Sequence, residues 1–272
     1  MTFAAREASD QDGAPVVLYH FQHGPASYRY ADSDRDAADV LGADWTAAAL
    51  RHEGFQSSGD ASREQFNVVC AASLPVAALY ARNAPGEPVR LTVRRWHEGD
   101  SDAAVVWVGY VVECKRATDA EATLVCQSVA ASFSRAGLRL GWQRSCPHAL
   151  YDSECRAGKA AFAVPGTVSA LSALHVLAAA FGAVPDGWFR GGWVEWQTAT
   201  GATERRAVEH HAGDACALLG GTEGLEPGQA VAAYPGCAHT LADCHNKFDN
   251  APNFGGIRLL PGRSPFDGMA VW

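Results

Sequence analysis

The sequence contains few charged residues and no basic run, and these two absences argue against some functional classes. Only 19% of its 272 residues are charged, and 22 Lys and Arg against 30 Asp and Glu give a formal net charge of −8. A dedicated DNA- or RNA-binding protein neutralises phosphates with a basic patch or stripe. We therefore do not expect this class, while an acidic surface by itself identifies no partner.

Long hydrophobic runs are also missing. The longest apolar stretch, residues 168–184, is interrupted by Ser and His and is shorter than the ~20 residues that a membrane-spanning helix needs. Residues 1–15 have no apolar segment between a basic end and a cleavage site, as a signal peptide would. We expect a protein with no membrane segment that is made in a cytosol, where its eight cysteines stay reduced.

Glycine and proline are abundant, and with alternating apolar residues they predict a mainly β protein with short helices. The chain has 27 Gly and 13 Pro, which favour turns. A short helix is predicted over 75–83, after a Pro suited to a first turn, and 169–181 fits either a buried helix or a pair of strands. Strands are predicted over 16–24, 27–36, 64–72, 88–100, 103–117, 121–129, 191–211 (two strands around a Thr-Gly turn) and 229–236.

The chain is divided by these patterns into two predicted domains, a β-rich N-terminal domain over 1–139 and a β-rich C-terminal domain over 140–272. The second domain opens with the loop CPHALYDSEC and closes with the loop CAHTLADC. No flexible linker and no further repeat is evident. The predicted fold class is therefore mainly β, with two β domains; whether the four cysteines of the two loops staple the second domain through a metal centre depends on the cysteine pattern described next.

The eight cysteines are of two kinds. Four lie inside apolar runs, where a cysteine acts as a small buried hydrophobic residue: Cys70, Cys114, Cys126 and Cys216. The other four lie among Pro, His, Gly, Asp and Asn in the two loops, where each sulfur is free to turn towards a shared point: Cys146, Cys155, Cys237 and Cys244.

Four thiolates around one centre suit zinc or an iron–sulfur cluster. Structural zinc usually takes cysteines two to four residues apart, whereas eight residues separate Cys146 from Cys155 and six separate Cys237 from Cys244. The wider loops favour a cluster over zinc, and two reduced loops without metal remain an alternative. Three nearby histidines are further possible ligands, although such residues more often form hydrogen bonds: His148, His239 and His245.

The two loops resemble the C-terminal part of the tail-tip hub proteins of long-tailed phages, a family that includes the minor tail protein L of lambda-like phages and the hub protein of gene transfer agents. The early loop matches by Cys146, Leu150, Tyr151 and Cys155. The late motif matches by Gly236, Cys237, Thr240, Cys244, Phe248, Asn250, Asn253, Phe254, Gly255, Gly256, Pro261 and Gly262. The first half, including YVVECKRA and ATLVCQS, resembles the family's N-terminal domain less sharply.

This resemblance implies a structural, non-enzymatic virion protein at the tail tip or baseplate. It implies that Cys146, Cys155, Cys237 and Cys244 hold a [4Fe–4S] cluster, with zinc as the second choice. The subunits would form a ring, expected to be a trimer, that joins the tail tube to a central fibre or receptor-binding protein and meets the tape measure protein. DNA would pass through the channel without sequence-specific binding, and the protein would take part in tail assembly and genome delivery.

Two enzymatic alternatives are weighed against this role. The first is an iron–sulfur or zinc redox enzyme, but four cysteines would saturate a cluster and no dinucleotide-binding fingerprint is present. The second is a tail-associated peptidoglycan hydrolase, for which His210, His211, Asp214 and Cys216 are crowded into one turn and Glu195 fits a strand face better than an acid catalyst. Two aromatic or apolar segments are candidates for ring contacts: 187–196 and the C-terminal SPFDGMAVW. The alternative is that these aromatics fill the protein's own core, as we expect for one of Trp193 and Trp196.

Overall fold

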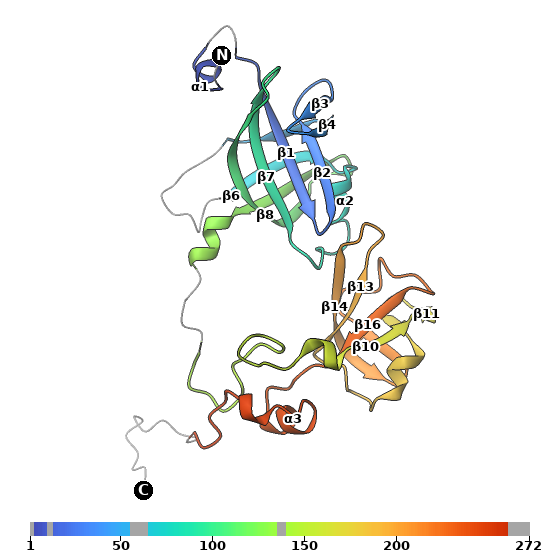
Figure 1. Cartoon of the computed structure of the whole chain (residues 1–272). Helices are drawn as coiled ribbons and strands as arrows, with labels where there is room; N and C mark the ends of the chain where they lie inside the picture. Colours follow the sequence, from blue (N-terminus) through green and yellow to red (C-terminus); the bar gives the residue numbers. More distant parts are fainter. Residues whose placement is uncertain (1–2, 10–12, 55–64, 135–139, 261–272) are drawn as a thin grey trace. The chain divides into compact units, whose positions relative to one another are not determined.

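A computed structural model describes residues 3–9, 13–54, 65–134 and 140–260. The chain divides into two compact units, the first of Met1–Arg135 with Thr198–Glu204 and the second of Ala136–Gln197 with Arg205–Trp272. Each unit is built on its own β-sheet (Figure 1). The prediction of a mainly β protein with short helices is therefore confirmed, while the domain limits at 139 and 140 stay a prediction. Among the described helices, none is long and apolar enough to cross a membrane.

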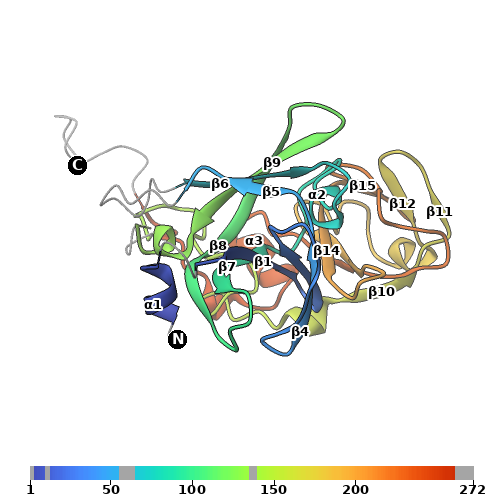
Figure 2. The same cartoon turned by 90° about the horizontal axis from the view of Figure 1, so that it is seen from above.

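The first unit contains a nine-stranded sheet in the order β3-β4-β2-β1-β7-β8-β9-β6-β5. Its strands are β1 (Pro15–His23), β2 (Ala26–Ala31), β3 (Ala37–Val40), β4 (Ala43–Ala47), β5 (Leu50–His52), β6 (Gln65–Ala71), β7 (Val89–His97), β8 (Ala103–Arg116) and β9 (Glu121–Ser128). The helices are α1 (Phe3–Glu7), α2 (Pro75–Ala78) and the 3₁₀ helix η1 (Val129–Ser134). β8 and β9 form a long hairpin (Figure 2).

The two ends of the first sheet are connected by a very short stretch of chain. β4 pairs in parallel with β2, β5 pairs with β6, and only Ala48 and Ala49 separate β4 from β5. The strand next to one edge of the sheet is thus joined through two residues to the strand at the opposite edge. The enclosed core is apolar because alternate residues of each strand point inwards, and Tyr19, Phe21 and Leu91 are fully buried in it.

The second unit contains a seven-stranded sheet in the order β10-β16-β13-β14-β15-β12-β11. The strands are β10 (Val164–Thr167), β11 (Ala170–Leu171), β12 (His175–Leu177), β13 (Trp193–Gln197), β14 (Thr203–Ala212), β15 (Ala215–Leu218) and β16 (Ala230–Tyr234). Its helices are α3 (Leu241–Asn246) and the 3₁₀ helices η2 (Lys159–Phe162), η3 (Ala179–Ala183) and η4 (Ala251–Asn253). The core residues include Val176, Phe181, Phe189, Val194 and Trp196.

Most predicted strands are confirmed, and the differences have physical reasons. The helix predicted over 75–83 extends only over Pro75–Ala78. The ambiguous segment 169–181 contains the strand pair β11 and β12, followed by η3. Cys114, predicted to be buried, is only partly buried, because β8 continues towards solvent at that point.

The aromatic segment 187–196 does not supply the exposed apolar surface that its sequence suggested. Phe189 and Trp196 are buried in the second core, and Trp188 packs against it. Trp193 stacks on Tyr234 with a 5.2 Å separation of the ring centroids. These rings pack within their own unit, which agrees with the alternative that they fill its core, and a ring contact by this segment stays a prediction. The other predicted contact, the C-terminal SPFDGMAVW, lies outside the described residues.

Candidate metal centre

The first cysteine loop, between Cys146 and Cys155, is folded around one carboxylate. Asp152 accepts hydrogen bonds from the backbone N–H groups of Ala149, Glu154 and Cys155 at 3.0, 3.0 and 2.6 Å. The bond from Cys155 is the main cause of a lowered pKa for the Asp152 carboxyl, and the bonds from Ala149 and Glu154 act in the same direction. The loop therefore holds Cys155 in place through local hydrogen bonds.

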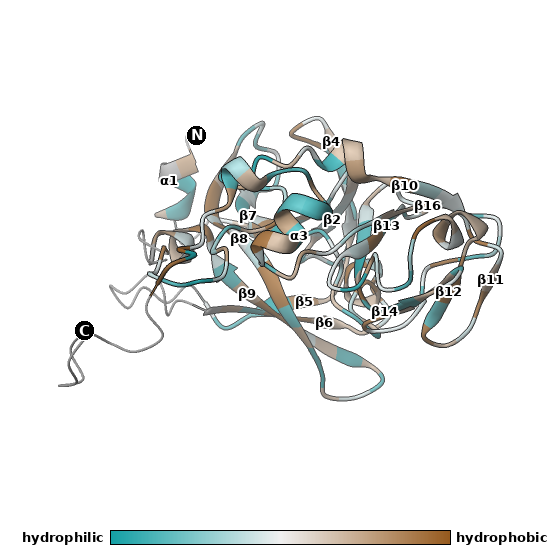
Figure 3. Ribbon diagram, turned by 90° about the horizontal axis from the view of Figure 1, so that it is seen from below, coloured by the Kyte–Doolittle hydropathy of each residue, from teal (hydrophilic) through white to brown (hydrophobic). Residues whose placement is uncertain are grey.

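The second cysteine loop follows β16 directly and contains the short helix α3. Thr240 caps this helix by accepting a 3.1 Å hydrogen bond from the backbone N–H of Asp243. Asp243 in turn accepts a 2.8 Å bond from the backbone N–H of Ala238. Residues of α3 are both hydrophilic and hydrophobic (Figure 3), and Cys244 is on the buried side. The cap thus fixes the position of Cys244 relative to Cys237.

The first loop is bonded at both ends to the segment that contains the second loop and the residues just after it. Cys146 donates its N–H to the carbonyl of His239 at 2.8 Å, and the Nδ1 atom of His239 lies 3.0 Å from the carbonyl oxygen of Cys146. At the other end, the Asn250 side-chain amide donates to the carbonyl oxygen of Cys155 at 2.6 Å. Segments about 90 residues apart in the chain are therefore held side by side.

All four loop cysteines line one small cavity of about 20 Å³. The cavity wall is completed by His148, Leu150, His239, Thr240, Phe248, Asn250 and Asn253. None of the four cysteines is in a disulfide. Burial raises the pKa of both the Cys237 and the Cys244 thiol. The other loop cysteines raise it further at Cys244, and Asp243 and then the other cysteines do so at Cys237, where the N–H of His239 acts in the opposite direction. Of the predicted additional ligands, His148 and His239 reach the cavity, while His245 is exposed and does not line it.

Several polar groups are directed at the sulfur atoms. The backbone N–H of His239 lies 3.3 Å from Cys237 Sγ, and the Asn250 amide lies 3.8 Å from Cys155 Sγ. The Cys244 thiol donates to the Asn250 carbonyl at 3.2 Å. N–H donors aimed at sulfur stabilise thiolates and tune metal centres built on them. The donor set and its surroundings therefore suit a soft metal or a cluster.

Neither kind of centre is preformed. Among the described residues, no three His, Cys, Asp or Glu side chains are arranged around a point that could hold a metal ion. A cavity of about 20 Å³ has room for one water-sized group, and an iron–sulfur cube is larger. The metal centre therefore stays a prediction.

An aromatic cluster around Tyr151 and the ammonium group of Lys247 contact the segments that line the cavity. The Tyr151 hydroxyl donates to the Pro235 carbonyl at 3.2 Å, and its ring contacts Phe162, Trp193, Tyr234 and Phe248. Lys247, which the sequence reasoning missed, donates to the carbonyls of Trp188 and Gly236 at 2.6 and 2.7 Å. A Lys just after a short helix was the only sequence signal for this contact.

The groups considered for hydrolase chemistry belong to the core and to a strand face. His211 is buried between the carbonyls of Phe181 and Gly213, at 3.2 and 3.0 Å. Cys216 is fully buried, and burial raises its pKa to about 12, which keeps the thiol protonated. His210 and Asp214 are exposed.

Glu195 is an ion-pair partner. Its Oε2 atom accepts from Lys159 Nζ and Arg205 Nε, both at 2.7 Å. Burial alone would raise the Glu195 pKa, but these two hydrogen bonds outweigh it and lower the pKa. A carboxylate that is held ionised in this way is unsuited to donate a proton.

Replacement of Asp152 tests whether the first loop is held by its carboxylate. We expect Asp152→Ala to destabilise the second unit by about 1–2 kcal/mol, as loss of a capping side chain does, and to loosen the Cys155 backbone. Chemical denaturation with thiol-labelling rates at Cys155 measures both effects. Glu154→Ala is the control, because Glu154 joins this hydrogen-bond set only through its backbone N–H and the substitution leaves that group in place. Equal labelling of the two variants would contradict the assignment.

Three kinds of comparison with known proteins each give a match. A family model described as "Phage conserved hypothetical protein BR0599" matches residues 187–264, which include the second cysteine loop. An uncharacterized protein of Xylella fastidiosa (strain 9a5c) is 29% identical over 189 residues, a match that covers 64% of the chain and 39% of that protein. The chain thus spans well under half the length of this relative.

The third match is structural. The fold is similar to that of a chain in the virion of a native gene transfer agent particle, with a TM-score of 0.77 and 20% sequence identity. The similarity covers 96% of this chain and 93% of the other. At this level of identity, the match shows that the two chains share a fold over nearly their whole length.

Proposed function

We propose that this chain is a structural protein of a phage or phage-like particle, and specifically a tail-tip hub subunit. The single observation that carries the proposal is that the shared fold with a gene transfer agent virion chain extends over both units and nearly the whole of each chain. The phage family model over residues 187–264 supports it independently. The four cysteines of the hub-like motif, gathered at one cavity, add to that support.

The four cysteines are proposed to hold a [4Fe–4S] cluster, with zinc as the alternative. Such a centre would act as a staple, because it would tie the start of the second unit to a loop near its end. The energy of metal binding would then be folding energy. The chain itself presents the four thiols, directs the His239 N–H and the Asn250 amide at sulfur, and closes the cavity with Phe248 and Leu150.

The proposed subunit forms a ring, expected to be a trimer, at the distal end of the tail tube. It joins the tube to a central fibre or receptor-binding protein, contacts the tape measure protein, and lets DNA pass. The net charge of −8 agrees with passage, since an excess of acidic groups does not attract phosphates. Its place of function is the virion, after synthesis in the host cytoplasm.

The cofactor proposal predicts a coloured protein. Protein purified without oxygen is expected to show broad visible absorption and to contain iron and acid-labile sulfide in equal amounts, about four of each per chain. Absorption spectroscopy with iron, sulfide and zinc assays of the same sample gives the answer. One zinc per chain without sulfide would support the zinc site instead of the cluster. Protein without iron, sulfide or zinc would refute a metal centre.

The position in the particle is tested by imaging. A cryo-electron microscopy map of intact particles is expected to contain this chain in a ring at the distal end of the tail. A map that places the chain in the capsid or in a peripheral fibre would contradict the hub proposal while leaving the virion role in place. Absence of the chain from purified particles would contradict both.

A further inference from the structure

Three arginines surround a histidine and a threonine on one face of the first sheet. His20 of β1 lies opposite Thr92 of β7, and Arg90 and Arg94 stand two residues to either side of Thr92. Arg29 of β2 lies opposite His20 from the other side. Residues two apart in a strand, and residues directly opposite each other in a ladder, share a face. The five side chains therefore point the same way, and we call the three arginines the arginine cluster.

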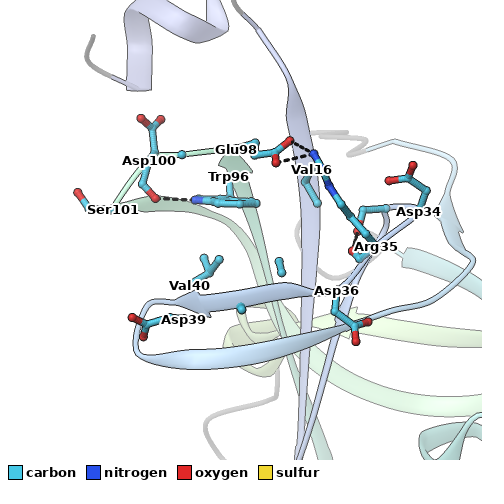
Figure 4. A pocket seen from close by; sticks show the side chains of 14 residues that line it. Val16, Asp34, Arg35, Asp36, Asp39, Val40, Trp96, Glu98, Asp100 and Ser101 are labelled. Carbon is cyan, nitrogen blue, oxygen red and sulfur yellow. Dashed lines mark hydrogen bonds and ion pairs between the residues drawn. The ribbon is translucent and has the colours of Figure 1, made fainter.

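The arginine cluster is on the outer face of the sheet. Alternate residues of the same strands, such as Phe21 and Leu91, are buried in the apolar core on the other face. The β3–β4 hairpin lies over the neighbouring part of the outer face, where Val16 and Trp96 line a groove of about 540 Å³ against it (Figure 4). Within the cluster, Arg90 is exposed and the other two arginines are partly exposed, so a solute can reach them.

The charge of the arginine cluster is not compensated. In the part of the chain that the structure describes, none of the three arginines forms an ion pair, although 30 Asp and Glu outnumber 22 Lys and Arg. The pKa of Arg94 is lowered, first by burial and then by Arg29 and Arg90. The pKa of His20 is likewise lowered by burial and then by all three arginines. Like charges held together in this way favour an anionic ligand.

Two acidic residues of the neighbouring groove are paired with other arginines. Glu98 accepts two hydrogen bonds from Arg35. Asp100 forms an ion pair of 3.1 Å with Arg6. The charges of these two carboxylates are therefore balanced where they lie.

The donors of this face suit a phosphate group. Four residues of β7 separate Arg90 from Arg94 by about 13 Å, and Arg29 starts about 10 Å away across β1, so the long side chains surround the space above Thr92. Each guanidinium presents a planar fork of N–H donors that matches phosphate oxygens, and a threonine hydroxyl is a further common phosphate contact. Three forks offer more donors than the two oxygens of one carboxylate can accept.

We propose that the arginine cluster, together with Thr92 and His20, binds a phosphate group. His20 is held at the centre of the site by a 2.6 Å hydrogen bond between its Nε2 atom and Ser27 Oγ. Tyr110 of β8 lies opposite Arg90 and is 40% exposed. An aromatic ring beside a basic surface is also found where single-stranded nucleic acids bind. The phosphate belongs either to a nucleic-acid backbone or to a small phosphate compound, and the site does not depend on the proposed tail-tip role.

Titration of the full chain with inorganic phosphate at constant ionic strength tests the site. The imidazole C–H signals of His20, assigned with His20→Gln, are followed by nuclear magnetic resonance and are expected to shift and saturate. Arg29→Gln/Arg94→Gln is expected to weaken binding at least about tenfold, through loss of two charge-assisted contacts. Arg90→Gln, a single exposed change, should weaken it in the same direction and replaces the double variant if circular dichroism shows misfolding.

Arg51→Gln is the matched control. It removes the same charge from β5, where Arg51 is paired with Glu121 at 3.0 Å, and it should bind phosphate like the wild type. Wild-type signals that do not shift, or shift without saturating, overturn the site. An equal loss in Arg51→Gln also overturns it, because binding would then follow net charge alone.

A second titration identifies the source of the phosphate. A short fluorescent single-stranded DNA that binds more than tenfold tighter than inorganic phosphate, and more weakly to Tyr110→Ala and to the double arginine variant, supports a nucleic-acid backbone. Inorganic phosphate that binds as tightly as the DNA supports a small phosphate compound. A polyglutamate peptide of the same charge that binds as tightly as the DNA overturns the proposal in favour of an acidic protein partner.

Discussion

Cys155→Ser is expected to abolish cluster content, and the same holds for Cys146, Cys237 and Cys244. The four thiols line one cavity and come in pairs from two loops, so loss of one leaves three ligands for a cube that needs four. Without the centre, the loops between 146–155 and 237–244 regain conformational freedom. The second unit should therefore unfold at clearly lower denaturant concentration, and iron should fall to background.

The control is a cysteine of the other kind. Cys126 is fully buried in the first unit, and burial raises its thiol pKa far above the ordinary value. Cys126→Ser should cost about 1–3 kcal/mol for a hydroxyl in an apolar site and leave iron content unchanged. Iron assays with denaturant unfolding of both variants make the comparison. Equal iron loss would show that the division of the cysteines into two kinds is wrong.

Local sequence patterns predicted the regular elements well where one face of a strand is buried. The alternation in residues 88–100 predicted β7, because every second side chain there enters the core of the first unit. Helix α3 was missed although its signal was present: Thr240 followed by Asp243 is a capping pattern before an apolar position. The segment 169–181 was ambiguous because short apolar runs fit either a helix or strands.

The residues of the candidate centre could be predicted from the sequence, but their arrangement in space could not. The pairing of Cys146 with Cys155 and of Cys237 with Cys244 follows from two short loops, but the bonds between the loops join residues about 90 positions apart. Asn250 and Lys247 act through backbone carbonyls that no local pattern identifies. Register between strands likewise brings Arg29 of β2 close to Arg90 and Arg94 of β7, and no local pattern predicts this.

The backbone around Gly236, next to Cys237, leaves no room for a side chain. A substitution at this position is therefore expected to have a large effect. At Gly236, a Cβ atom would overlap the carbonyl oxygen of Arg190 and the backbone of Gly191 and Gly192. The obstacle is backbone on the strand entry to β13, which cannot rotate away as a flexible side chain can. The Gly236 carbonyl also accepts the Lys247 ammonium at 2.7 Å, so displacement of residue 236 disturbs the helix that carries Cys244.

Gly236→Ala is therefore expected to destabilise the second unit by more than about 3 kcal/mol, at the upper end of single-residue effects, and to prevent metal uptake. The cause is steric, because one methyl group must push Cys237 away from the other three thiols. Gly158→Ala is the control, since a Cβ there meets nothing within 4 Å and its φ of −74° suits any residue. Denaturant unfolding and iron content of both variants give the measurement. If Gly236→Ala kept its iron and its stability, as the control Gly158→Ala is expected to, the prediction would be contradicted. Cys237 would then be positioned by something other than the close packing of residue 236 against residues 190–192.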